Sequence, residues 1–145
     1  MNRIAALAGV GVVLALAACG PKVSTNSQGD VTVSNNGTTI TAGKRPPANL
    51  PGWLKVYPGA TVTTGAVLGQ GGMLGFDTTD SPDKIVAFYN DIAKANGIAV
   101  NTDAATETSR AVDYRAPAPS KLNFVLTVAS EGGKNHVAIL YGPQS

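Results

Sequence analysis

The stretch LNFVLTVASEGGKNHVAILY, residues 122–141, decides the fold, because it predicts a β-hairpin whose register follows from its turn. With the Gly-Gly pair as the two turn residues, the opposite charges of Glu131 and Lys134 meet beside the turn. The same register pairs large apolar side chains on one face: Val128 with Val137, Leu126 with Ile139, and Phe124 with Tyr141. The second face, with Val125 opposite Leu140, is moderately apolar. The hairpin therefore belongs to a sheet with at least one face in a core.

A helix that could cover this face is predicted by DTTDSPDKIVAFYNDIAKANG, residues 77–97. Ser81 can cap a helix, Pro82 suits its first position, and Gly97 suits a left-handed end. Apolar side chains recur at helical spacing along one side, namely Ile85, Phe88, Tyr89 and Ile92. The pattern predicts an amphipathic helix over residues 82–96 that packs on the sheet.

Further strands complete the predicted domain. Residues 61–68 and 72–79 are joined by a glycine-rich turn, GQGG, and weaker strands are expected at 98–100 and 110–114. Two strands, a helix and then about four strands are typical of a helix packed on an antiparallel sheet. We therefore predict an α+β fold over residues 53–145. A curved antiparallel sheet of about five to six strands packs against one amphipathic helix, after an N-terminal signal helix and a polar stalk.

Residues 19–52 predict a polar, lipid-anchored stalk. Residues 20–52 hold no aromatic side chain and are rich in Ser, Thr, Asn, Gly and Pro. Within them, residues 31–42 alternate apolar and polar side chains around an Asn-Gly pair, which predicts a hairpin with Val33 opposite Ile40. An isolated hairpin is marginal in water, so it either docks on the domain or forms only part of the time. The sequence leaves that choice open.

The first residues combine a positive charge with a short apolar run. Arg3 is followed by residues 4–16, which are apolar without interruption, and these thirteen residues are too few for a membrane-spanning helix, which needs about 20. Small residues then lead to the one cysteine of the chain. This arrangement resembles bacterial lipoprotein precursors, whose lipobox of leucine, two small residues and cysteine is matched by Leu16, Ala17, Ala18 and Cys19.

The resemblance implies a processed and acylated protein. Residues 1–18 would be a signal peptide, the three residues before the cysteine would be recognised by the signal peptidase, and Cys19 would receive acyl chains such as palmitate. Two or more chains anchor a protein stably to a membrane. Gly20, in place of the Asp that retains many such proteins in the inner membrane, implies the outer membrane, facing the periplasm. The membrane, contacted through the lipid on Cys19, is thus an expected partner.

A second resemblance covers residues 57–97. The phrase YPGA, a hairpin and then TDSPDKIVAFYNDIAKANG are similar to small bacterial envelope proteins in which a YPGA motif precedes a helix. This resemblance implies a fold, and its motif contains no catalytic residue.

Composition, charge and the positions of titratable residues limit the classes of function that this chain can have. Removal of Arg3 with the signal peptide leaves 10 basic against 9 acidic residues, without a large basic cluster, so nucleic acid is not an expected partner. A metal site or catalytic triad would depend on His136, the one histidine, which has no acid nearby in sequence. Asp77, Asp80 and Asp83 lack the spacing of a calcium loop. We therefore expect no catalytic residue, metal or cofactor, and no enzyme activity.

Two functions fit these observations. The first is a non-catalytic interaction module of the cell envelope that binds an envelope protein or polymer. The second is a pocket for a small apolar or amphiphilic ligand, suggested by the glycine-rich GAVLGQGGMLGF and by the aromatic residues Trp53, Phe88, Tyr89 and Tyr114. Eight aromatic residues are about what the core of such a domain requires, which favours the first function.

Overall fold

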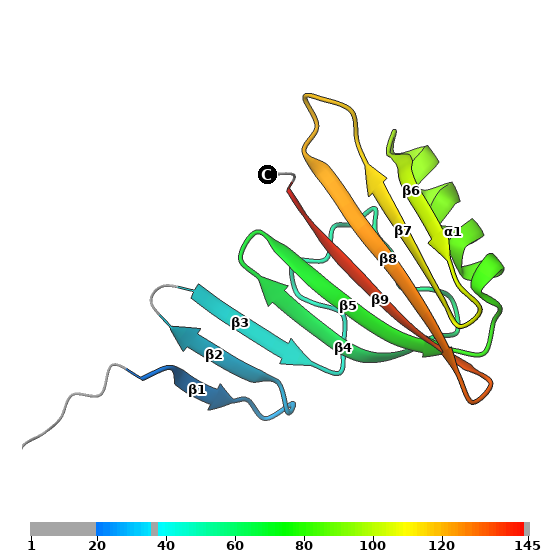
Figure 1. The fold of residues 1–145 in the computed structure, drawn as a ribbon. Coiled ribbons are helices and arrows are strands. Elements are labelled where there is room, and N and C mark those ends of the chain that lie inside the picture. The colour runs from blue at the N-terminus through cyan, green and yellow to red at the C-terminus, as the bar shows by residue number, and fades with distance from the viewer. Residues whose placement is uncertain (1–19, 36–37, 144–145) are drawn as a thin grey trace, which may run out of the picture.

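A computed structural model describes residues 20–35 and 38–143 of the 145-residue chain. Within these residues the chain forms one antiparallel sheet of nine strands and one helix (Figure 1). The elements are β1 (Lys22–Thr25), β2 (Val31–Asn35), β3 (Thr38–Gly43), β4 (Thr61–Leu68), β5 (Gly71–Thr78), α1 (Pro82–Ala95), β6 (Ala99–Ala105), β7 (Ser109–Arg115), β8 (Leu122–Glu131) and β9 (Lys134–Pro143). The strands lie in the order β1-β2-β3-β4-β5-β9-β8-β7-β6.

The predicted fold, an α+β layer with about five to six strands on one helix, was wrong. The sheet has nine strands and extends well beyond the helix: Figure 1 shows α1 beside β6 and β7 at one end and β1–β3 at the other. β1, β2 and β3 come from the segment that was predicted to be a stalk. That segment gave a weak strand signal because its strands lie beyond the helix-covered core, where polar residues can occupy the strands. The predicted signal helix of residues 1–18 lies outside the described residues.

The C-terminal hairpin has the predicted register. Glu131 lies opposite Lys134, and the apolar pairs are Val128 with Val137, Leu126 with Ile139, and Phe124 with Tyr141. Gly132 and Gly133 have φ angles of 58° and 79°, the left-handed conformation that this two-residue turn requires. The paired apolar side chains are buried, so this face of the sheet lines the core as predicted.

The helix α1 lies where the sequence predicts it. Ser81 caps its N-terminus by accepting a hydrogen bond from the N–H of Lys84, and Gly97, with a φ of 67°, follows its last turn. The side chains that α1 buries are Ile85, Val86, Tyr89 and Ala93. Phe88 and Ile92 pack against the edge of the core and are only partly buried. The buried stripe is therefore slightly rotated from the predicted one.

Aromatic rings fill the core between the sheet and its cover, which consists of α1 and the loop of residues 44–60. Tyr114 stacks on Phe124 with ring centroids 4.2 Å apart, and Tyr89 meets Phe124 edge-on at 6.4 Å. All three rings are 0% exposed. The interior beneath α1 is thus occupied by side chains.

The hairpin predicted over residues 31–42 forms and docks on the domain. β2 pairs with β3 with Val33 opposite Ile40, as predicted, whereas the turn residues 36–37 lie outside the described residues. β3 continues the sheet by pairing with β4, which places Ile40 opposite Leu68. The question that the sequence left open is therefore answered by strand pairing.

Candidate interaction surface

Figure 1 looks onto the face of the sheet that α1 does not cover, because α1 and the loop of residues 44–60 lie behind it. Side chains alternate between the two faces of a strand, so the neighbours of buried core residues point to this second face. Leu140, for example, lies between the buried Ile139 and Tyr141, and Met73 precedes the buried Leu74. We name this second face the open face.

An apolar stripe crosses the open face from β1 to β8. The register makes each row of it continuous, because directly opposite side chains have Cβ atoms only about 5 Å apart. The first row consists, in order across the strands, of Val23, Val33, Ile40 and Leu68. The second row consists of Val31, Ala42, Ala66, Met73, Leu140 and Val125. Val23 is 64% exposed and Val125 is 37% exposed, so both ends of the stripe are open to solvent.

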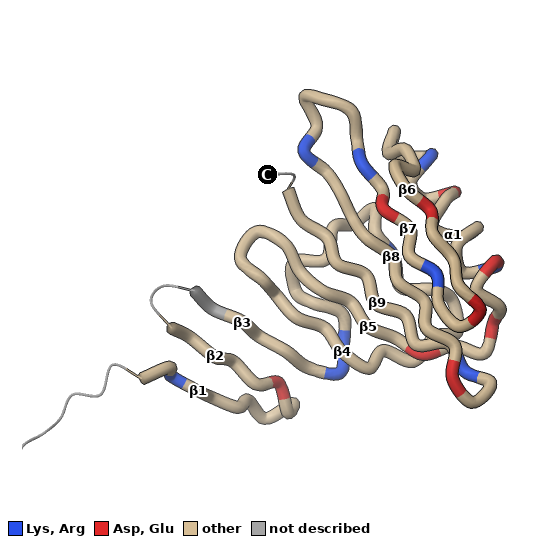
Figure 2. Tube along the Cα trace, in the orientation of Figure 1, with Lys and Arg blue, Asp and Glu red and all other residues tan. Residues whose placement is uncertain are grey.

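Charged side chains border the apolar stripe and do not interrupt it. His136 Nδ1 lies 2.7 Å from Asp77 Oδ1 towards one end of β9 and β5, and Arg115 donates from Nε to Asp113 Oδ2 (2.9 Å) on β7. Figure 2 shows the same pattern, with a largely uncharged centre of the sheet and charges towards the strand ends and the α1 side. An apolar centre with a polar rim is the arrangement of a binding surface.

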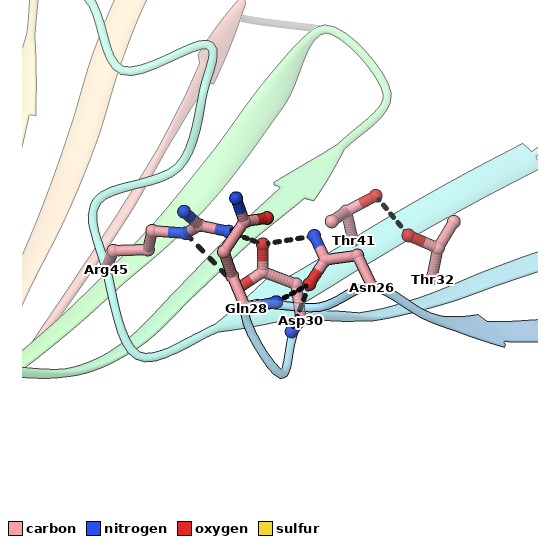
Figure 3. Close-up of polar contacts among 6 residues, drawn as sticks. All are labelled: Asn26, Gln28, Asp30, Thr32, Thr41 and Arg45. Carbon is pink, nitrogen blue, oxygen red and sulfur yellow. Dashed lines mark hydrogen bonds and ion pairs between the residues drawn. The ribbon is translucent and has the colours of Figure 1, made fainter.

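A nearly buried carboxylate fastens β1–β3 to the rest of the domain (Figure 3). Asp30, 8% exposed, accepts hydrogen bonds from the Arg45 guanidinium and from Asn26 Nδ2 (2.9 Å). Asn26 Oδ1 accepts from the backbone N–H groups of Gln28 and Asp30, which closes the turn between β1 and β2. Arg45, and then Asn26, hold the pKa of Asp30 below its usual value. The ionised Asp30 therefore joins the β1–β2 turn to the segment that follows β3.

Two glycines provide the space for this contact. A Cβ atom on Gly43 would lie 2.8 Å from Asp30 Cγ, and one on Gly65 would lie 2.9 Å from Pro47 N. The segment of residues 44–47 therefore lies directly on β4. A hollow of about 610 Å³ adjoins it, and the charged groups in its wall, Asp30 and Arg45, already bind each other.

The aromatic residues that suggested a ligand pocket mostly belong to the core. The Tyr89 hydroxyl donates to the Lys55 carbonyl (3.0 Å) and the Tyr114 hydroxyl donates to Asn90 Oδ1 (2.7 Å). Burial raises the pKa of both tyrosines above the ordinary value of 10.0. Trp53 borders a smaller hollow, about 240 Å³, whose other apolar walls are Pro51, Leu122, Tyr141 and Pro143.

The lipobox residues Leu16, Ala17, Ala18 and Cys19 lie outside the described residues, so acylation stays a prediction. No helix within residues 20–35 and 38–143 has the length and apolar character needed to cross a membrane.

The other residues that the sequence singled out are separated by the fold. Asp77 is an acid distant in sequence from His136, and the fold places it directly beside this histidine. Asp80 accepts a hydrogen bond from the Tyr57 hydroxyl (2.8 Å), while Asp83 pairs with Arg110 (2.7 Å). In the part of the chain that the structure describes, no three His, Cys, Asp or Glu side chains gather as a metal site would require.

The sequence showed only fragments of the apolar stripe. Val125 opposite Leu140 and Val33 opposite Ile40 were visible as local pairs in two separate hairpins. Joining them requires the pairing of β3 with β4 and of β5 with β9, which brings together residues far apart in the chain. The alternating Val, Ile and Ala residues of the presumed stalk were the signal that could have indicated a sheet face.

Comparison with known proteins identifies the family to which the domain belongs. The search of curated proteins found no match. Among solved structures, the solution structure of cyanobacterial PsbP (CyanoP) from Synechocystis sp. PCC 6803 is similar, with a TM-score of 0.49 and 12% identity over 97% of this chain and 86% of that one. The family model described as START domain-like matches residues 59–134, which contain β4 to β8 and α1. Because this match covers more than half of the sequence, the chain belongs to the START domain-like family.

Proposed function

We propose that this protein is an envelope lipoprotein, anchored through Cys19 to the outer membrane and facing the periplasm, that acts as a non-catalytic interaction module. The lipobox supports the anchor. The apolar stripe carries the interaction: ten uncharged residues lie in register across seven neighbouring strands. A solvated sheet face normally presents polar side chains, whereas this stripe is apolar and bordered by charged pairs, and the largest apolar patch of a monomer, typically about 300–600 Å², is often functional.

The anchor is tested by mass spectrometry of the protein purified from its own membranes. Trypsin cleaves after Lys22, so an acylated protein should yield the short peptide of residues 19–22 with the added mass of a diacylglycerol thioether and an N-acyl chain. Cys19→Ala should lack this modified peptide. An unmodified Cys19 in the mature protein would refute the anchor.

The interaction surface is tested by cross-linking in cells followed by mass spectrometry. Ile40→Asp and Leu140→Asp place a charge within the apolar stripe, and both should reduce the cross-links of the intact protein to the protein or lipid neighbours of this face. Val100→Asp is the matched control, because Val100 is 47% exposed and lies outside the stripe. Cross-links that survive in all three variants would exclude the stripe as the binding surface.

A second candidate function is the binding of a small apolar or amphiphilic ligand. The hollow beside Trp53 supports it, because its walls include Leu122 and Tyr141. Native mass spectrometry of protein from its own membrane should then show a bound small molecule that Trp53→Ala loses. Release of the same molecule by Leu140→Asp would place it on the open face instead.

A further inference from the structure

The apolar stripe begins next to the predicted anchor. Val23, its first residue, lies in β1 and is four residues from Cys19. Four residues span at most about 14 Å, because an extended chain covers at most ~3.6 Å per residue. A stalk of residues 19–52 would have let the domain stand far from the membrane, but β1–β3 belong to the sheet. An acylated Cys19 therefore holds one end of the stripe at the bilayer.

We propose that the apolar stripe lies on the phospholipid bilayer and forms a second membrane contact beside the lipid anchor. This inference rests on the proposed function, because it takes Cys19 to be acylated. It names the partner of the open face as the phospholipid surface and orients the domain with α1 turned away from the membrane.

The chemistry of the open face suits the boundary between lipid headgroups and acyl chains. The stripe consists of aliphatic side chains and one methionine, and its most exposed members are Val23 and Leu140. Amphipathic faces of this kind enter the boundary to a depth of about 5–10 Å. The charged pairs of Asp77 with His136 and of Asp113 with Arg115 lie at the margins, where they remain in water or among headgroups.

The size of the stripe favours a membrane over a second copy of the chain. Seven strands about 4.8 Å apart give a width of roughly 30 Å, and two rows give a height of about 10 Å, so the stripe covers roughly 300 Å². A stable protein interface buries about 800 Å² on each partner. The stripe is therefore small for association from solution. It is sufficient where an anchor already confines the chain to the surface, because the entropic cost of association is then much reduced.

The contact should weaken with distance from β1. Neighbouring strands rotate by about 20–25° relative to each other, so a nine-stranded face cannot lie flat on a plane. The part nearest the anchor, at β1 to β4, should touch the bilayer most closely. The part at β9 and β8, which includes Leu140, should lie nearer the headgroups or in water.

The experiment uses full-length acylated protein in vesicles of phosphatidylethanolamine and phosphatidylglycerol. The thiol of acylated Cys19 is blocked, so one introduced cysteine can carry an environment-sensitive dye. Val23→Cys and Ser24→Cys form a matched pair, because they are consecutive residues of β1, both exposed, with side chains on opposite faces. Ile40→Cys and Leu140→Cys report on the rest of the stripe. Spin-labelled lipid should quench the dye at Val23→Cys roughly twofold or more over Ser24→Cys, with Ile40→Cys intermediate and Leu140→Cys weakest, as a face inserted ~5–10 Å requires.

Each other outcome overturns the inference in a distinguishable way. Equal quenching at positions 23 and 24, with an acylated peptide of residues 19–22, would reject the bilayer contact and leave the lipoprotein proposal intact. Dye shielding without lipid quenching, together with disulfide-linked dimers of unlabelled Val23→Cys under oxidising conditions, would assign the stripe to a second copy. Shielding that appears only after an envelope protein is added would assign it to that protein. An unmodified Cys19 would reject both proposals.

Discussion

Gly65→Ala tests the contact that holds the β1–β3 extension to the domain. Gly65 lies in β4, and the new methyl carbon would lie 2.9 Å from Pro47 N and closer still to the Arg45 carbonyl oxygen. Non-bonded heavy atoms prefer separations of about 3.5–4.0 Å, so the segment of residues 44–47 must move by an ångström or more. That movement would pull the Arg45 guanidinium away from Asp30.

The expected cost follows from the rigidity of the atoms involved. The methyl group meets backbone atoms and not the end of a flexible side chain, so the strain cannot be relieved by a rotamer change. Forcing a methyl group into a packed site costs about 1–3 kcal/mol. A loss of about 2 kcal/mol in a domain of this size lowers Tm by roughly 8 °C.

Calorimetry and amide hydrogen exchange together measure this effect. Gly65→Ala should lower Tm and reduce the protection of the turn that contains Asp30 more than that of β8 and β9. Gly52→Ala is the control, because its Cβ would have no heavy atom within 4 Å. If Gly65→Ala melts within about 1 °C of Gly52→Ala, a change worth only a few tenths of a kcal/mol, the packing of residues 44–47 on β4 is incorrect.

Three further changes test the core, the carboxylate cluster and a buried hydroxyl. Phe124→Ala removes a ring that is 0% exposed, and it should lower the free energy of unfolding by about 3–5 kcal/mol in a urea titration; a loss below about 1 kcal/mol would contradict the packing. Arg45 lowers the pKa of Asp30 from 3.8, so its stabilisation is present above that pH and is lost as the pH falls through the lower folded-state pKa. Amide protection factors in β2 should therefore fall on acidification, and Asp30→Asn should remove this dependence. Burial raises the pKa of Tyr141 from 10.0 to about 12, so its stabilisation is complete below pH 10.0 and is lost as the pH rises towards 12. Tyr141→Phe should flatten the fall of Tm over that range, and an unchanged slope would show that the hydroxyl is not shielded.

Elements set by local chemistry could be predicted, and the extent of the sheet could not. The helix was recognisable because Ser81 and Gly97 mark its ends and its apolar residues recur with helical period. The C-terminal hairpin was recognisable because its turn fixes the register of every pair. The pairing of β3 with β4 depends on backbone hydrogen bonds between segments separated by the loop of residues 44–60, and such bonds carry no side-chain pattern. The polar composition of residues 20–52 was therefore read as a stalk.

The candidate surface could be predicted only in pieces for the same reason. Each hairpin showed one apolar pair on its second face, such as Val125 with Leu140. The cluster that fixes the extension joins Asp30 to Arg45, fifteen residues later, and depends on glycine at position 65 of a different strand. A single sequence shows the glycine but not the backbone that lies against it. The apolar stripe and the cluster of Asp30 and Arg45 that holds β1–β3 in place both depend on contacts between residues that are far apart in the chain.

The edge strand β1 supports placing the open face at the membrane. An open sheet presents unpaired backbone groups at its edges, and proteins protect such edges with short strands, proline and lysine. β1 has only four residues, all exposed, begins at Lys22 and follows Pro21. These features discourage the pairing of β1 with a strand of another chain. Because Cys19 is only three residues before β1, a lipid on it would also keep this edge at the bilayer surface, where headgroups and water can satisfy its backbone. The edge is therefore poorly suited to strand addition, and the adjoining apolar stripe is the part of this end of the molecule suited to binding.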